Sequence, residues 1–328
     1  MYLRLSSENT NMRIKTALLL TVLVAVGCVN NRKAEQFSAL PFPDVKAPSM
    51  IQDQQQIAEY LVEHWWDGLT DPQRNYPCDS TLVSGVSKGD VEQKFANWTV
   101  LLGAVDYKVA VKSVNRLFDR VVACEKKDTA SNVFEEMSAI MEKYLYDPNS
   151  PMRNEDFYGP YVARLSQCEF VDEGMRQAHA FDARMCTLNR VGTEAADFRF
   201  SDVNGKIHNL YGVRADYTIL FFSNPGCTAC LDIIKTLKSF PQVQAGIRSG
   251  KLAVLNIYID EDLQAWKEYM PIYPTEWYNG YDPDYVIRTD ILYNVRAIPS
   301  LYLLDKDKKV IMKDTPEARL FDWLNNLL

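Results

Sequence analysis

The chain has 328 residues, of which 24% are charged and 47% hydrophobic, and its formal net charge is -7. These values are those of an ordinary globular protein and exclude a largely disordered chain. The acidic balance argues against a nucleic-acid partner, and the length predicts two domains.

The N-terminus has the layout of a secretory signal. Arg13 and Lys15 precede an apolar run over residues 17–26, which is too short for a permanent membrane span and ends just before Cys28. This ending resembles a bacterial lipobox, in which the cysteine is lipidated and becomes the mature N-terminus. We therefore predict a signal peptide with a lipobox over residues 1–28, with plain secretion as the alternative.

A polar segment follows the signal. Residues 29–48 contain three prolines and little periodic apolar character, which predicts a tether between the lipid anchor and the folded part. No acidic run follows Cys28, which favours an anchor that faces the periplasm, on the outer membrane more than on the inner one. The mature chain is expected to work outside the cytoplasm.

Residues 49–190 show helical spacing of apolar residues throughout and predict an all-α domain of five or six helices. Asp90 is the predicted N-cap of the second helix. The predicted helices cover residues near 57–65, 95–102, 111–122, 133–145, 157–165 and 175–185.

Two stretches of this domain invite a functional interpretation. The run His64-Trp65-Trp66-Asp67 has the composition of a ligand-binding cluster, but its helical spacing favours a core and its rim. The charges in residues 149–155 are explained by helix capping and a local ion pair. The three histidines of the chain are widely separated, which argues against a His-based metal site or a Cys–His hydrolase.

Four further cysteines lie in this domain. An oxidising compartment permits disulfides among them, but the sequence does not choose among the pairings, and buried free thiols are equally compatible with it. These residues are Cys78, Cys124, Cys168 and Cys186.

From residue 191 the pattern changes to strands that alternate with helices, which predicts an α/β domain with a mixed sheet over residues 191–328. A hairpin turn is expected at Asn204-Gly205. Strands are predicted near residues 198–200, 207–210, 217–222, 252–259, 301–304 and 310–312. Helices are predicted after Cys227 and near residues 261–270, 287–293 and 316–328.

The stretch that carries chemistry begins where the apolar strand 217–222 ends. An Asn-Pro-Gly turn follows, and then Cys227-Thr228-Ala229-Cys230 opens an amphipathic helix. The positive end of a helix stabilises an anion, so Cys227 should be a nucleophilic thiolate, with Cys230 one turn away and within reach of a disulfide. Taken alone, the CxxC also fits half of a zinc site or a structural pair.

Three motifs, in order, resemble the thioredoxin-fold domain of membrane-anchored, extracytoplasmic reductases. They are the opening 191–198, the CxxC at 227–230, and the loop 295–301 with Pro299. The helical domain resembles an uncharacterised domain that precedes thioredoxin-like domains in Bacteroidetes lipoproteins. The resemblance implies a central mixed sheet flanked by helices, a cis Pro299, and a thiol–disulfide oxidoreductase.

The resemblance also implies residue roles. Cys227 would attack a substrate disulfide, Cys230 would resolve the mixed disulfide, and Ile298 with Pro299 would bind the substrate chain. No cofactor or metal is implied, and the partners would be protein disulfides or thiols and a membrane electron donor. Phe221 and Ile233 stand where related proteins carry acids, so a non-catalytic binding or scaffold lipoprotein remains the alternative, with metal handling third.

Overall fold

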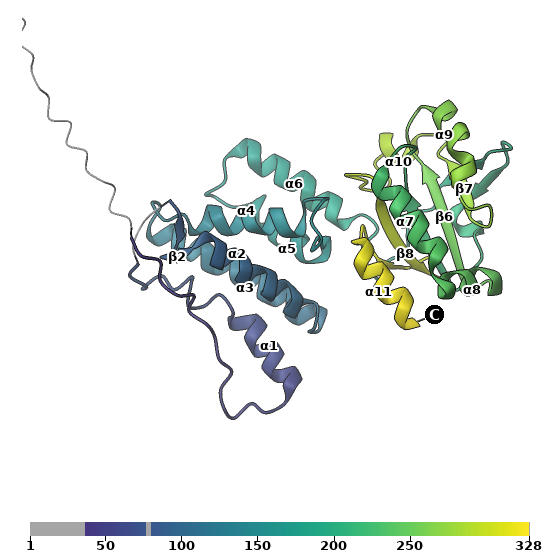
Figure 1. Cartoon of the computed structure of the whole chain (residues 1–328). Coiled ribbons are helices and arrows are strands. Elements are labelled where there is room, and N and C mark those ends of the chain that lie inside the picture. Colours follow the sequence, from purple (N-terminus) through teal and green to yellow (C-terminus); the bar gives the residue numbers. More distant parts are fainter. Residues whose placement is uncertain (1–36, 77–79, 328) are drawn as a thin grey trace, which may run out of the picture. The chain divides into compact units, whose positions relative to one another are not determined.

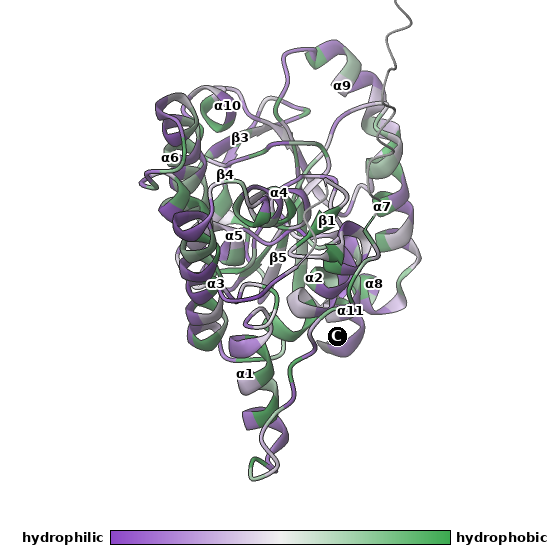
Figure 2. Ribbon diagram, turned by 90° about the vertical axis from the view of Figure 1, so that its left-hand side faces the viewer, coloured by the Kyte–Doolittle hydropathy of each residue, from purple (hydrophilic) through white to green (hydrophobic). Residues whose placement is uncertain are grey.

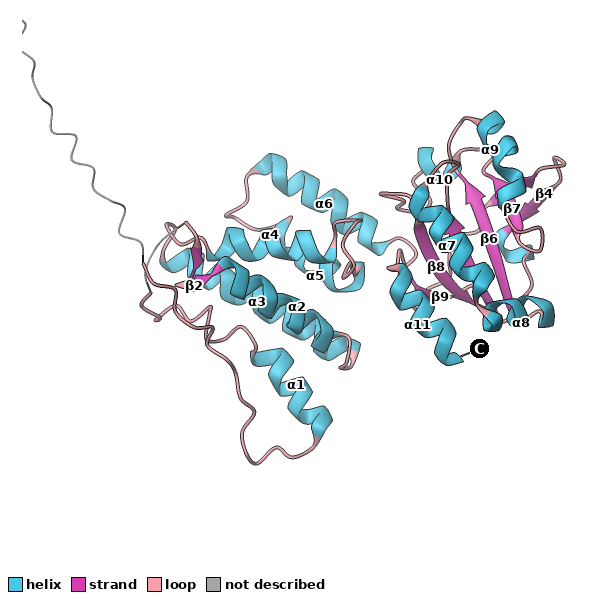
Figure 3. Ribbon diagram, in the orientation of Figure 1, coloured by secondary structure: helices cyan, strands magenta, loops and turns pink. Residues whose placement is uncertain are grey.

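The computed structural model of this protein describes residues 37–76 and 80–327. A helical N-terminal region and an α/β C-terminal region are both present, which confirms the predicted fold class (Figure 3). The predicted lipobox with Cys28, and Cys78, lie outside the described residues. No helix in the described part of the chain is both long and apolar enough to cross a membrane.

The helical region contains the predicted helices. Its elements are α1 (Gln54–His64), α2 (Lys88–Leu102), α3 (Tyr107–Lys127), α4 (Val133–Leu145), α5 (Glu155–Leu165) and α6 (Glu173–Thr187). A small hairpin of β1 (Leu82–Val83) and β2 (Val86–Ser87) was not predicted. Its two-residue strands are too short to show a period, and the turn Ser84-Gly85, with φ of 48° and 79°, is what forms it.

The predicted N-cap of α2 is wrong by one turn. Ser87, not Asp90, caps the helix, because its Oγ accepts a hydrogen bond from the Asp90 N–H at 3.1 Å. The Asp90 carboxylate in turn accepts from the Ser87 hydroxyl at 2.8 Å. Asp90 therefore takes the third helical position, and its backbone N–H is the one that the N-cap side chain satisfies.

The His64–Asp67 run forms part of the core and a polar cluster, as its helical spacing favoured. Trp66 is 3% exposed and packs edge-on against Trp98, with ring centroids 5.7 Å apart. Asp67 pairs with His64 at 2.8 Å, with Arg116 at 2.7 Å and with Arg120 at 3.3 Å. We call these four polar residues the Asp67 cluster.

The cysteines of the helical region that the structure describes are free thiols. Cys124, Cys168 and Cys186 are all buried and unpaired with one another. Burial raises the pKa of the Cys124 and Cys186 thiols above the usual cysteine value. They therefore behave as small apolar core residues rather than as nucleophiles.

The α/β region is built on a seven-stranded sheet with the order β4-β3-β7-β6-β5-β8-β9 (Figure 1). The strands β5, β6 and β7 run parallel and the remaining pairs are antiparallel, so the sheet is mixed as predicted. The strands are β3 (Arg199–Asp202), β4 (Ile207–Asn209), β5 (Tyr217–Phe222), β6 (Leu252–Tyr258), β7 (Tyr278–Tyr281), β8 (Ser300–Asp305) and β9 (Val310–Met312).

The helices of this region are α7 (Thr228–Ser239), α8 (Pro241–Ser249), α9 (Leu263–Tyr269), α10 (Val286–Thr289) and α11 (Glu317–Leu327). The sequence analysis missed α8 and β7. The strand β7 contains Asn279 and Gly280, which are poor strand formers, and it is held by pairing with β3 and β6.

Alternation along the strands sorts side chains to two faces of the sheet. Ile219 and Phe221 of β5 pack in one core with residues of α7, α8, α9 and α11, whereas Leu220 and Phe222 pack in another with Ile287 of α10 and Tyr293. The helices carry both hydrophobic and hydrophilic residues along their length (Figure 2). The two-sided burial of β5 explains its unbroken apolar sequence.

Candidate active site

The CxxC loop connects the end of β5 to the start of α7. The Cys227 N–H donates to the Asn224 carbonyl at 3.3 Å and closes a turn with Pro225-Gly226 at its centre. Gly226 has a φ of +73°, a conformation that favours glycine at the third position of a type II turn. The turn chemistry read from the sequence therefore brings the chain directly from the strand into the helix.

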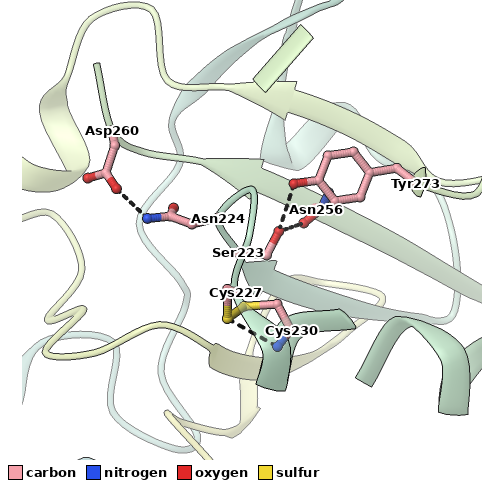
Figure 4. Close-up of a disulfide and its surroundings, with 7 residues drawn as sticks. All are labelled: Ser223, Asn224, Cys227, Cys230, Asn256, Asp260 and Tyr273. Atoms are coloured by element: carbon pink, nitrogen blue, oxygen red, sulfur yellow. Dashed lines mark hydrogen bonds between the residues drawn. A yellow bond between two sulfur atoms is a disulfide. The ribbon is translucent and has the colours of Figure 1, made fainter. Parts of the chain in front are cut away.

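The two cysteines form a disulfide at the beginning of α7. Cys227 is the N-cap residue, and its Sγ accepts a hydrogen bond from the Cys230 N–H at 3.1 Å (Figure 4). Cys227 is half-buried, whereas Cys230 is 1% exposed. One sulfur is therefore accessible at a helix N-terminus, where a negative charge is favoured, and the other is enclosed.

The Ile298–Pro299 peptide bond is cis, the geometry that the resemblance implied. Ser300, the next residue, begins β8 and pairs with Phe222 at the end of β5. Because the CxxC loop follows Phe222 after a few residues, the cis bond and the disulfide lie at the same end of the sheet. Ile298 and Cys227 both pack against the same core cluster.

The positions that carry acids in related proteins are apolar and buried here. Phe221 is 0% exposed and Ile233 is 4% exposed. The nearest acid in sequence, Asp232, has a side chain that is 66% exposed and pairs with Lys235 at 3.4 Å. The structure thus gives Asp232 no place in the core beside Cys230.

A group of neutral polar side chains occupies the interior next to the CxxC loop. The Ser223 hydroxyl donates to Asn256 Oδ1 at 2.5 Å and lies 3.5 Å from the Tyr273 hydroxyl, while Asn256 Nδ2 donates to Asn279 Oδ1 at 3.1 Å. We call these four residues the Ser223 cluster. Burial raises the pKa of Tyr273, so its hydroxyl is neutral at physiological pH.

The Ser223 cluster fixes the start of the loop rather than the sulfurs. Figure 4 shows the Ser223 hydroxyl pointing toward Asn256 and Tyr273 and not toward the disulfide. On another side, the Asn224 amide donates to the Asp260 carboxylate, which also binds Arg288. The loop is therefore anchored by polar contacts immediately before Pro225.

Sequence reasoning missed these anchoring residues. Asn256 carried a signal, since it is the one polar residue in the apolar strand β6, and a buried strand admits such a residue only with hydrogen-bond partners. Ser223 and Asp260 each directly follow a strand region and resemble ordinary loop residues. Their partners come from elements 33 to 50 residues away, which no local pattern reports.

Among residues 37–76 and 80–327, no group of three or more His, Cys, Asp or Glu side chains is arranged as metal ligands would be. The CxxC pair therefore has no further candidate ligands in the described part of the chain. Its geometry is that of a disulfide within one helical turn.

A family profile described as "Domain of unknown function (DUF5106)" matches residues 11–185. A comparison with curated proteins found no match. The chain is thus similar, over its N-terminal half, to a family without an assigned activity.

Solved structures extend the similarity to the whole folded part. A thioredoxin-like protein from Bacteroides caccae is 33% identical, covers 89% of this chain and 100% of its own, and superposes with a TM-score of 0.76. The C-terminal domain of an uncharacterized protein from Bacteroides fragilis is 44% identical over 42% of this chain and 98% of its own, with a TM-score of 0.41. A domain of a possible thiol-disulfide isomerase from Cytophaga hutchinsonii is 26% identical over 42% of this chain and 91% of its own, with a TM-score of 0.36.

Proposed function

The chain belongs to the DUF5106 family and is thioredoxin-like in its C-terminal part, and from this premise we propose that it is a thiol–disulfide oxidoreductase acting on protein disulfides. The observation that carries the proposal is the Cys227–Cys230 disulfide at the N-terminus of α7, at the same sheet end as the cis Ile298–Pro299 bond. A purely structural disulfide would not need an accessible sulfur at the end of a helix.

The first step begins from the reduced pair. The Cys227 thiol loses its proton and the thiolate is stabilised by the Cys230 N–H and by the end of the helix. The thiolate attacks one sulfur of the substrate disulfide, a mixed disulfide forms, and one substrate thiolate leaves. The Ile298 backbone next to Pro299 would pair with the extended substrate chain and align it.

The second step closes the disulfide seen in the structure. The Cys230 thiol loses its proton and attacks the Cys227 sulfur, and the second substrate thiolate leaves with the electron pair of the broken bond. The substrate gains two electrons and two protons, and the enzyme is left oxidised. An external dithiol donor must then reduce the Cys227–Cys230 bond for turnover.

The buried surroundings of Cys230 shape this second step. With Phe221 and Ile233 apolar and the Ser223 hydroxyl turned away, solvent water is the proposed acceptor of the Cys230 proton. Burial in apolar surroundings disfavours the thiolate, so resolution should be the slower step. The mixed disulfide should therefore accumulate.

Reduction of insulin by a dithiol, with and without the protein, tests the proposal. The Cys227→Ser variant should lose at least about a thousandfold of the rate, as when a nucleophile is removed. The Cys230→Ser variant should instead retain substrates as mixed disulfides that a reductant releases. Cys124→Ser is the matched control, since its buried thiol donates to the Thr70 carbonyl, which a hydroxyl can also do, and its rate should be unchanged.

A second candidate is a binding or scaffold protein that keeps the fold without turnover. The apolar residues Phe221 and Ile233 favour it, because the resolving cysteine then lacks a nearby acid. In that case Cys227 of the reduced protein would react with iodoacetamide as an ordinary thiol with a pKa of about 8.5. A wild-type rate no higher than that of Cys227→Ser would establish this candidate instead.

We further propose the location and division of the chain read from its sequence. These are a lipidated Cys28 after a signal at 1–28, a tether at 29–48, a helical domain at 49–190 and a thioredoxin-like domain at 191–328, held on a membrane facing the periplasm, with the outer membrane preferred. A membrane electron donor would then supply the dithiol. Loss of fatty-acid labelling and release from the membrane fraction in Cys28→Ala would support the anchor, and unchanged labelling would refute it.

A further inference from the structure

The charged segment at residues 149–155 does not form the local ion pair that its sequence suggested. Asn154 does cap α5, since its side chain accepts from the Asp156 N–H at 3.0 Å. Arg153, however, donates through Nε to the Asp314 carbonyl at 2.8 Å and through Nη2 to the Thr315 carbonyl at 2.9 Å. Its partners lie more than 160 residues along the chain, in the α/β region.

Glu155 also connects the helical region to the α/β region, through ion pairs. Its carboxylate pairs with Lys313 at 2.7 Å and with Arg296 at 3.2 Å, and the Asn294 amide donates to it at 3.4 Å. Glu155 is 4% exposed, so these ion pairs are shielded from solvent. A glutamate on the first turn of α5 is thus buried against groups of the other region.

Arg296 is the link to the candidate active site, because it stands three residues before Pro299. Its Nη2 also pairs with the Asp314 carboxylate at 3.0 Å. Its guanidinium lies 4.0 Å from the centre of the Tyr146 ring, just after α4. Two residues of the helical region, Glu155 and Tyr146, therefore contact the side chain of one residue in the cis-proline loop.

The other end of the loop converges on the same carboxylate. Asp314 Oδ1 accepts a hydrogen bond from the Ser300 hydroxyl at 2.8 Å, and Ser300 directly follows Pro299. Arg296 and Ser300 thus bracket Ile298 and Pro299, and Asp314 ties both together. The helical region reaches this bracket at two residues: Glu155 and Tyr146 contact Arg296, and Arg153 contacts Asp314.

Burial favours a positioning role over a stabilising one. Bringing these charges out of water is costly, and buried ion pairs are frequently no more stabilising than apolar residues of similar size. What a buried ion pair does provide is one preferred geometry, here set by the contacts of Arg296 Nη2 with Glu155 and Asp314. The carboxylates of Glu155 and Asp314 outweigh the effect of burial and raise the pKa of Arg296, so the guanidinium is charged at any physiological pH.

We infer that the helical region positions the cis-proline loop through the Glu155–Arg296–Asp314 network, and so sets how an extended protein substrate aligns with Cys227. Glu155 and Arg296 are positioning residues in this scheme, and neither touches the reacting sulfurs. The inference rests on the proposed oxidoreductase function. It gives the DUF5106 region a task in the reaction of the following domain.

The test compares Glu155→Gln and Arg296→Gln with the wild type on two substrates. For insulin, whose chain pairs with the loop, each variant should lose about tenfold in kcat/KM. Oxidised glutathione is too small to pair with the loop as a protein chain would, so its kcat/KM should fall by less than about twofold. The midpoint potential of the Cys227–Cys230 pair should be the same in the variants and the wild type. The double variant should lose no more kcat/KM on insulin than the worse single variant, because both substitutions remove the same Glu155–Arg296 ion pair.

Glu92→Gln is the matched control. It removes a glutamate of the helical region that pairs with Lys143 at 2.7 Å at the surface, and it should change neither substrate's kinetics. An equal loss of kcat/KM on both substrates, or no loss on insulin, would overturn the inference.

Amide hydrogen exchange gives a readout that does not depend on activity. In Glu155→Gln, residues 295–301 should exchange faster by about tenfold while β5 keeps its protection, and Glu92→Gln should leave both unchanged. Unchanged exchange in the loop would overturn the inference even if the enzyme is active. A wild-type protein without disulfide reductase activity would instead refute the proposed function, and the exchange result would still decide whether the helical region holds the loop.

Discussion

The Asp67 cluster lies at the edge of the helical core and is charged, whereas the Ser223 cluster lies inside the α/β region and is neutral. In the Asp67 cluster a carboxylate meets two arginines and a histidine, and the Asp67 side chain is 30% exposed. In the Ser223 cluster two amides and two hydroxyls meet, and Ser223 is 0% exposed.

Access to water explains this difference. Charges at the edge of the helical core keep part of their hydration, whereas a charge beside the CxxC loop would lose nearly all of it. The difference shows that the two clusters should respond differently to pH. The Asp67 cluster contains a carboxylate with a lowered pKa, whereas the Ser223 cluster beside the CxxC loop is made of amides and hydroxyls.

The largest effect is expected from placing a charge in the neutral cluster. Asn256→Asp keeps the size of the side chain but replaces the amide that donates to Asn279 Oδ1 with a carboxylate, which repels that oxygen. The residue is only 1% exposed, so the new charge would be buried. We expect the free energy of unfolding at pH 7 to fall by about 2–4 kcal/mol. Urea denaturation measures it.

The pH dependence of the Asn256→Asp variant distinguishes charge from shape. Burial should raise the pKa of the new carboxyl above its unfolded value of about 3.9. The destabilisation should therefore be small below that pH and grow as the pH rises toward the folded pKa. A penalty that is the same at pH 4 and pH 7 would show that shape, and not charge, is the cause.

The next effect concerns the charged cluster. Burial alone would raise the pKa of Asp67, but hydrogen bonds from Arg116 and His64 and the charge of Arg120 outweigh it and lower that pKa below 3.8. Asp67→Asn should therefore reduce the free energy of unfolding by about 1–2 kcal/mol at pH 7, allowing for solvent screening.

Because the folded pKa of Asp67 is lowered, its contribution is fully present above about pH 4, the unfolded pKa, and is lost as the pH falls through the folded value. The difference between wild type and Asp67→Asn should therefore shrink in acid. Insulin reduction by the variant should match the wild type at pH 7. A lower rate with intact folding would contradict the separation of the two clusters.

A smaller effect is expected within the neutral cluster when no charge is introduced. Tyr273→Phe removes a hydroxyl that lies 3.5 Å from Ser223 Oγ, a weak contact, and keeps the ring in place. Stability should change by about 1 kcal/mol or less, and the pH profile of the insulin reaction should stay the same. A displaced profile would mean that the Tyr273 hydroxyl exchanges protons with Cys230.

The smallest effect is expected at Glu92. The hydrogen bond from Lys143 lowers the pKa of Glu92 despite the opposing effect of burial, and the Lys143 side chain is exposed. Glu92→Gln should change the free energy of unfolding by no more than about 0.5 kcal/mol in thermal or urea denaturation. Asp67 is about as exposed as Glu92 but pairs with three basic side chains, so a loss as large as that of Asp67→Asn would mean that the number of partners does not set the size of these effects.

Much of the fold was predictable because its signals are local. The spacing of apolar residues indicated each helix of the helical region, and the apolar strands β5 and β6 stood out in the same way. The prediction failed where tertiary pairing overrides local preference, as in β7 with Asn279 and Gly280, or where an element is too short to show a period, as in β1 and β2. At α2, Ser87 and Asp90 are both good caps, and only the backbone geometry distinguishes them.

The sequence by itself determined the CxxC at a helix start, the glycine that its turn requires, and the proline that precedes β8, since each depends on a few consecutive residues. Only the tertiary structure decided the partners of buried charges and amides. Glu155 and Arg296 are 141 residues apart and Ser223 and Tyr273 are 50 apart, and each pair meets because packing brings their elements together. The physical reason is that a buried polar group must find its partner wherever the fold puts one, which no local pattern records.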